Sequence, residues 1–159
     1  ECRTEFFNIG DPITPPAETY QWLIRDFARK VEDNIASKRG LAKITEAMRV
    51  VYYDLAGKIL AENRQVIPCY AGVSNVHINF DGGVWPCCVL GYEKEMGNLR
   101  EYGYDFQKLW YSPKAKEVRK FIKGKNCACP LANQAYSNEL LHFPTLVRAG
   151  IKMMEFSRK

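Results

Sequence analysis

Four of the six cysteines lie in two groups that are far apart in the sequence, and these groups restrict what the chain can fold into. Cys69 and Cys87 flank an expected β-hairpin, whereas Cys127 and Cys129 form a Cys-x-Cys pair after an expected basic helix. Soft thiolate ligands suit an iron–sulfur cluster or zinc better than they suit hard cations. The pattern therefore predicts one metal site assembled from distant segments.

The composition is typical of a globular protein. The chain has 159 residues and 47% of them are hydrophobic, which is sufficient for a buried core. It contains no apolar run of about eighteen residues, the length that spans a bilayer. The N-terminus has neither a hydrophobic signal region nor an initiator Met. We therefore expect a soluble segment of a longer protein, without membrane contact.

Six cysteines could instead form three disulfides in a secreted domain. The chain is long for such a scaffold, and the adjacent Cys87 and Cys88 and the close Cys127 and Cys129 fit simple pairing poorly. We expect free thiols in the reducing cytoplasm.

The formal net charge is +5, and much of the surplus lies between residues 114 and 125. The basic side chains of this stretch are Lys114, Lys116, Arg119, Lys120, Lys123 and Lys125. A nucleic-acid surface would be broader and would carry stacking aromatic residues. The stretch predicts a solvated helix face, and nucleic acid is not an expected partner.

Helical spacing of apolar residues predicts two amphipathic helices in the first 65 residues. The first is expected to be capped by Thr14 or a neighbour and to end at Gly40, and its apolar positions are Tyr20, Leu23, Ile24, Phe27 and Val31. The second is expected from about Leu41, and its apolar positions are Ile44, Met48, Val51, Leu55 and Ile59.

The period then changes from helical to alternating over residues 76–80, and Asp81-Gly82 is a strong tight-turn signal. This predicts a hairpin in which Phe80 faces Gly83, Ile78 faces Trp85 and Val76 faces Cys87. In that register Cys87 shares the apolar face and Cys88 points away.

Pro86 interrupts the expected strand, so Cys88 is kept as a reserve ligand. We expect ordinary polar roles for His77 and His142. The aromatic residues Phe80, Trp85 and Trp110 are expected to pack and to shield the site.

Local capping signals organise the segment that follows. Residues 96–99 predict a turn, and Asp105 is expected to cap a short helix that ends near Trp110. Ser112-Pro113 is expected to open the basic helix, which runs to about Lys123 and stops at Gly124. The apolar positions of this helix are Ala115, Val118, Phe121 and Ile122. Packing them on the hairpin would bring the Cys-x-Cys pair beside the other cysteines.

Several stretches closely resemble SPASM/twitch domains, the C-terminal auxiliary-cluster domains of radical S-adenosylmethionine (radical SAM) enzymes. They are Cys69-Tyr70-Ala71-Gly72, "INFDGGVWPC" ending at Cys87, "GNLREYGYDFQKLWYSPKAKEVRKFI", and Cys127-Ala128-Cys129. The resemblance extends from about Cys69 to Asn133. The two leading helices look like a connector from a preceding barrel.

The resemblance implies a 4Fe-4S cluster on Cys69, Cys87, Cys127 and Cys129, close to the opening of a radical SAM barrel in the same parent chain or in a partner. There it would conduct electrons or bind substrate. Many relatives carry a further cysteine where this chain has Asn133, so a second auxiliary cluster is not expected.

Cleavage of S-adenosylmethionine requires a Cys-x-x-x-Cys-x-x-Cys loop, and the sequence contains no such spacing. We therefore expect no cleavage by this chain alone, and the cofactor only in a longer parent chain. Cys2 cannot replace the triad and is expected to be a free thiol.

Together these patterns predict an α+β protein in which a helical connector (1–65) precedes an iron–sulfur domain (66–159). Its expected role is that of an auxiliary module of a radical SAM oxidoreductase or maturase. Two alternatives stay open at this point. The same four cysteines could hold a structural zinc ion in an interaction module, or they could only pack in a scaffold that binds no metal.

Overall fold

The computed structural model describes residues 15–35 and 37–157, which form two compact units. The first, here called the cysteine unit, comprises residues 68–127. The second, the helical unit, comprises 15–67 and 128–157. The last two helices therefore group with the first two. Division into domains at residue 65 stays a prediction.

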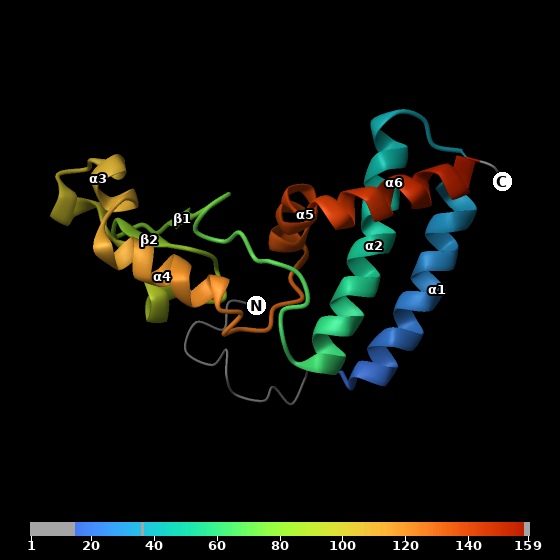
Figure 1. Cartoon of the computed structure of the whole chain (residues 1–159), viewed down its shortest axis with the longest axis horizontal. Helices are drawn as coiled ribbons and strands as arrows, with labels where there is room; N and C mark the ends of the chain where they lie inside the picture. The colour runs from blue at the N-terminus through green and yellow to red at the C-terminus, as the bar shows by residue number, and fades with distance from the viewer. Residues whose placement is uncertain (1–14, 36, 158–159) are drawn as a thin grey trace. The chain divides into compact units, whose positions relative to one another are not determined.

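The helical unit contains four helices (Figure 1). They are α1 (Ala17–Ile35), α2 (Leu41–Glu62), α5 (Ala132–Leu141) and α6 (Phe143–Ser157). Helix α2 contacts α1, α5 and α6, so it is the central helix of the unit. The sequence reasoning anticipated α1 and α2 but assigned no elements to the segment that forms α5 and α6.

Helix α1 differs from the expected helix at its end and in its buried face. Ile24 is buried, but Leu23 and Phe27 are 41% and 43% exposed, so the predicted apolar face is only partly covered. The helix ends at Ile35 instead of Gly40. Gly40 precedes α2, and its φ of 56° suits a residue without a side chain. Thr14, the expected cap, lies outside the described residues.

Helix α2 begins at Leu41, as predicted, and supplies most of the core of the helical unit. Met48, Val51, Leu55 and Ile59 are buried, which confirms their expected helical stripe, whereas Ile44 in the first turn is exposed. Two clusters form around this helix. One contains Met48, Val51, Leu55, Ile67 and Ala149, and the other contains Ile35, Ala47, Val50 and Phe156.

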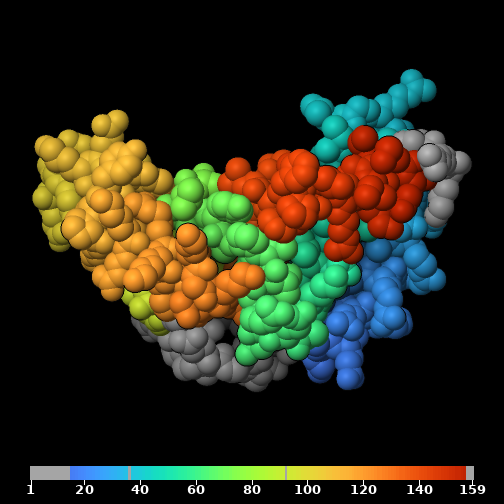
Figure 2. Space-filling model, in the orientation of Figure 1, coloured from blue at the N-terminus to red at the C-terminus, as the bar shows by residue number. Residues whose placement is uncertain are grey.

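Helices α5 and α6 form part of the surface of the helical unit, and α6 (red in Figure 2) carries apolar side chains there. The exposed apolar residues of α6 include Phe143, Val147, Ile151 and Met154. Among the described residues, no helix combines the length and the apolar character needed to cross a membrane.

The cysteine unit combines short helices with a small sheet, and with the helical unit it gives the α+β architecture that was predicted. Three antiparallel strands occur in the order β1-β2-β3. Its elements are β1 (His77–Ile78), β2 (Gly83–Trp85), the 3-10 helices η1 (Gly91–Lys94) and η2 (Leu99–Tyr102), β3 (Gly97–Asn98), α3 (Phe106–Trp110) and α4 (Pro113–Lys123).

The predicted hairpin exists, but its predicted register is wrong by one residue. His77 pairs with Trp85 and Ile78 pairs with Val84. The loop is longer than a two-residue turn, because the Asn79 N–H donates to the Gly83 carbonyl across it (2.8 Å). A slip of one residue exchanges the two faces of a strand. The pairing of Val76 with Cys87 therefore no longer supports Cys87 as the ligand.

Burial differs between the two strands of the hairpin. Val84 is 0% exposed, whereas Ile78 and Phe80 are 57% and 90% exposed. The prediction that Phe80 packs and shields the site is therefore wrong.

The expected turn at residues 96–99 is instead a third strand. Gly97 pairs with Val84 and Asn98 pairs with Gly83. Gly97 has a φ of 142°, and a Cβ there would lie 3.3 Å from Leu109 Cγ. Close packing therefore explains why glycine occupies this position.

The predicted caps of α3 and α4 are confirmed. The Asp105 carboxylate accepts from the Lys108 N–H (3.0 Å) at the start of α3. The Ser112 hydroxyl accepts from the Ala115 N–H (3.1 Å) at the start of α4, and Gly124 ends that helix.

Replacing Ser112 by alanine is expected to lower the free energy of unfolding by about 1 kcal/mol, because it leaves the Ala115 N–H without its acceptor in a buried position. Urea unfolding checks this value. Lys114→Ala in the same helical turn is exposed and should change the free energy by less than about 0.5 kcal/mol. Equal losses in the two variants would contradict the capping role.

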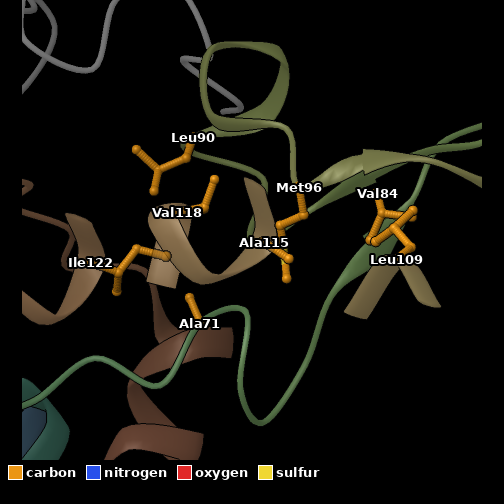
Figure 3. Close-up of a cluster of buried hydrophobic side chains, with 8 residues drawn as sticks. All are labelled: Ala71, Val84, Leu90, Met96, Leu109, Ala115, Val118 and Ile122. Atoms are coloured by element: carbon orange, nitrogen blue, oxygen red, sulfur yellow. The ribbon is translucent and has the colours of Figure 1, made fainter. Parts of the chain in front are cut away.

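The core of the cysteine unit lies between the sheet and the helices α3 and α4 (Figure 3). The predicted apolar residues of α4 are confirmed as part of it, apart from the half-buried Phe121. The buried members are Ala71, Val84, Leu90, Met96, Leu109, Ala115, Val118 and Ile122. This core is the surface on which the cysteine-bearing segments rest.

Candidate metal centre

Cys69 directly precedes a tight turn. The Tyr70 carbonyl accepts from the N–H groups of Val73 (3.0 Å) and Ser74 (2.8 Å). The next residue, Ala71, is 1% exposed and belongs to the core of the cysteine unit. The turn and this buried alanine therefore hold the Cys69 segment against the core.

Cys87 follows β2 through Pro86 and begins a turn of its own, in which the Gly91 N–H donates to the Cys87 carbonyl (3.1 Å). The backbone N–H groups of Val89 and Leu90 are directed at the Cys87 sulfur and lower the pKa of its thiol. Burial raises that pKa by more, so the net shift is upward. Amide donors that converge on a sulfur stabilise a thiolate once a metal neutralises it.

Cys127 follows the end of α4. The Gly124 N–H donates to the Lys120 carbonyl (3.0 Å), and the Lys125 N–H donates to the Ile122 carbonyl (2.9 Å). The side-chain amide of Asn126 closes the turn on the Phe121 carbonyl (2.8 Å). These contacts direct the chain from α4 back to the core, against which Cys127 packs.

Three of the four cysteines of this unit are neighbours. Cys69, Cys87 and Cys127 are half-buried, form no disulfide and pack against the same core. Burial raises the pKa of Cys127 to about 12, and the charges of Cys69 and Cys87 add to the shift. Three thiols that oppose one another's ionisation are a favourable place for a positively charged group. Their donor chemistry fits an iron–sulfur cluster.

The thiols do not form the compact shell of a single ion. Over residues 15–35 and 37–157, no three side chains of His, Cys, Asp or Glu are arranged so that they could hold a metal ion.

Cys129 belongs to the helical unit, two residues beyond Cys127. Its N–H donates to the Gln65 side-chain carbonyl (3.4 Å), and Gln65 is 3% exposed. The next carbonyl, that of Pro130, accepts from the Tyr52 hydroxyl (2.9 Å). Two side chains of the helical unit thus anchor the backbone around Cys129. Its membership of the ligand set stays a prediction.

The other residues considered as metal ligands lie in surroundings different from those of Cys69, Cys87 and Cys127. Cys88 is half-buried, and its charge affects Cys87, so it lies beside the site. His77 is exposed on β1, and the His142 Nδ1 is 2.7 Å from the Thr145 hydroxyl, which is an ordinary polar contact. Cys2 lies outside the described residues.

The sequence reasoning missed the buried role of Arg119. It grouped this arginine with the solvated lysines of α4, but Arg119 is half-buried and donates to two backbone carbonyls. The sequence did contain a signal for the burial of Arg119. Position 119 lies four residues after Ala115 and three before Ile122, which places it on the apolar face of the helix.

The fold and the clustered thiols define a small cysteine-rich α+β domain. Residues 69–130 match the family model of SPASM, described as an iron–sulfur cluster-binding domain. This segment is therefore similar to SPASM domains. Neither the curated proteins nor the solved structures contained a match to the chain.

Proposed function

We propose that this chain binds one 4Fe-4S cluster through the thiolates of Cys69, Cys87, Cys127 and Cys129. The observation that carries the proposal is the meeting of three of these thiols, from distant segments, on one buried core. The family match over residues 69–130 spans all four. When bound, such a cluster supplies one-electron transfer, or an iron that substrate can approach.

The chain's own groups suit that role. The N–H groups of Val89 and Leu90 would stabilise negative charge on Cys87, and partial burial of the thiols would keep water from most of the cluster. Both factors tune the reduction potential of an iron–sulfur centre. The cysteines among the described residues form no disulfide, which suits a reducing compartment, and we propose the cytoplasm as the location of the protein.

We further propose that the domain serves as the auxiliary-cluster module of a radical SAM oxidoreductase or maturase. The support is the family match together with the resemblance of the segment to such modules. The triad that cleaves S-adenosylmethionine is absent from this sequence, so a radical SAM barrel in a longer chain or in a partner would supply it.

Anaerobic reconstitution of the whole chain with iron and sulfide tests the cluster proposal. We expect about four iron and four sulfide per chain and the broad visible absorption of an iron–sulfur centre. A variant with Cys69, Cys87 and Cys127 all changed to alanine is the matched control and should bind neither. Tight binding of one zinc with rejection of iron and sulfide would replace the proposal with a structural zinc module.

A further inference from the structure

Three cysteine-bearing segments converge on Gly72, three residues after Cys69. The Gly72 N–H donates to the carbonyls of Asn75 (3.0 Å) and Pro86 (3.1 Å), and Pro86 directly precedes Cys87. A Cβ at Gly72 would lie 3.2 Å from Pro86 Cβ, and its φ of 72° favours glycine. The Cys69 and Cys87 segments are therefore in direct contact here.

Arg119 connects the third segment, the helix that leads to Cys127, to the same glycine. Its Nη1 donates to the Gly72 carbonyl (3.3 Å), and its Nη2 donates to the Trp110 carbonyl. The guanidinium also lies over the Trp110 ring, 4.8 Å from the ring centre. One side chain of α4 thus contacts the turn after Cys69 and the end of α3.

The contacts of Arg119 depend on the shape of its side chain. A guanidinium is planar, directs several N–H groups in fixed directions and stacks on aromatic rings, and a lysine ammonium does not. The guanidinium of Arg119 meets two backbone carbonyls and an aromatic ring, which suit this shape. The role of Arg119 is therefore to hold backbone segments at a fixed separation.

We propose that Arg119 is a positioning residue of the metal centre. By fixing Gly72 against α4, it holds the Cys69 and Cys87 segments in place before iron and sulfide arrive. This inference rests on the proposed function, because it concerns the assembly of the same site. A site that is already ordered loses less conformational entropy when its ligands bind.

The first test uses the protein without metal and compares Arg119→Gln and Arg119→Lys with Lys120→Gln. Lys120 is exposed on the same helix, so its variant is a matched control for the loss of charge. Hydrogen exchange of the Gly72 amide, followed by NMR, should be about tenfold faster in both Arg119 variants and unchanged in the control. An unchanged rate in both Arg119 variants would overturn the proposal.

The second test is cluster assembly in the same proteins. The initial rate of reconstitution should fall about tenfold in both Arg119 variants, and the electron paramagnetic resonance spectrum of the reduced cluster should become heterogeneous. Arg119→Lys keeps the charge, so a loss similar to that of Arg119→Gln identifies the planar guanidinium as the cause. If Arg119→Gln does not fold, Arg119→Lys carries both tests.

The outcomes separate this inference from the proposed function. If the wild-type chain takes up neither iron nor sulfide, the proposed function fails and this inference fails with it. If the wild type loads normally and the Arg119 variants load at the same rate with the same spectrum, only the positioning role is overturned. Faster exchange at Gly72 with unchanged loading overturns the positioning role as well.

Discussion

Replacing Cys87 by alanine will abolish most of the iron and sulfide loading, whereas replacing Cys88 will leave it nearly complete. Cys87 packs on the core beside Cys69, and the N–H groups of Val89 and Leu90 are directed at its sulfur. A cluster that loses one of four thiolates loses a strong ligand that no neighbouring group replaces in the same position. Iron and sulfide analysis after anaerobic reconstitution measures both variants.

The two cysteines are adjacent, so Cys88→Ala is a closely matched control for Cys87→Ala. It removes the same atoms one residue away and keeps the same backbone. Full loading in Cys87→Ala together with loss in Cys88→Ala would show that Cys88 is the ligand. Equal and complete loading in both variants would show that neither thiol is required.

The second large effect is a loss of stability with rising pH, and it arises from Glu139 in α5. This glutamate is 1% exposed, and its two carboxylate oxygens accept no hydrogen bond from the described residues. Burial raises its pKa from 4.5 to about 8, although the charge of Arg148 opposes the shift. Glu139 is therefore protonated in the folded protein at neutral pH.

An acid whose pKa is raised in the folded state lowers the stability of the fold once the pH is high enough for the unfolded chain to ionise. Below pH 4.5 the folded and unfolded chains both carry the proton, so the pH has no effect through this group. Between pH 4.5 and about 8 the unfolded chain ionises first, and the free energy of unfolding falls by up to roughly 1.4 kcal/mol per pH unit. Above about pH 8 the folded and unfolded chains are both ionised at this position, so the free energy of unfolding falls no further through this group.

Glu139→Gln should remove most of this loss, because glutamine does not ionise. Thermal unfolding followed by circular dichroism should show nearly equal stabilities for the variant and the wild type near pH 4.5, the acidic end of the window. The variant should be more stable by a few kcal/mol at its alkaline end. Glu18→Gln, an exposed change in α1, is the control and should shift stability by less than about 1 kcal/mol at any pH.

We compare the free energy of unfolding of the wild type with that of Glu139→Gln. In this difference, the contributions of groups that titrate alike in both proteins cancel. Asp54, which pairs with Arg148 (2.8 Å), has a lowered pKa, so its contribution is lost only below its usual value of 3.8, outside this window. A difference that does not change with pH would show that Glu139 ionises normally in the fold.

Much of the local structure followed from the sequence. The start of α2, the Asp105 cap of α3 and the Ser112 cap of α4 were predicted from residues within one helical turn of each feature. The buried stripe of α2 followed from helical spacing alone. Such signals succeed because the interacting groups are three or four residues apart, and the chain cannot separate them.

The errors in the hairpin concern contacts between distant residues. The hairpin register was wrong because the third strand, pairing Gly83 with Asn98, and the burial of Val84 decide which face of β2 points inward. The turn signal at Asp81-Gly82 does not contain that information.

The sequence by itself indicated the chemistry of the site, because four cysteines in this order and spacing favour a soft metal or an iron–sulfur cluster, and residues 69–130 match the model of a cluster-binding family. Only the tertiary structure decided which thiols become neighbours, which arginine of a basic helix turns inward, and that Glu139 loses contact with water. The physical reason is that ligand type is a property of individual side chains. Burial, register and pKa shifts depend on residues brought together from distant parts of the chain.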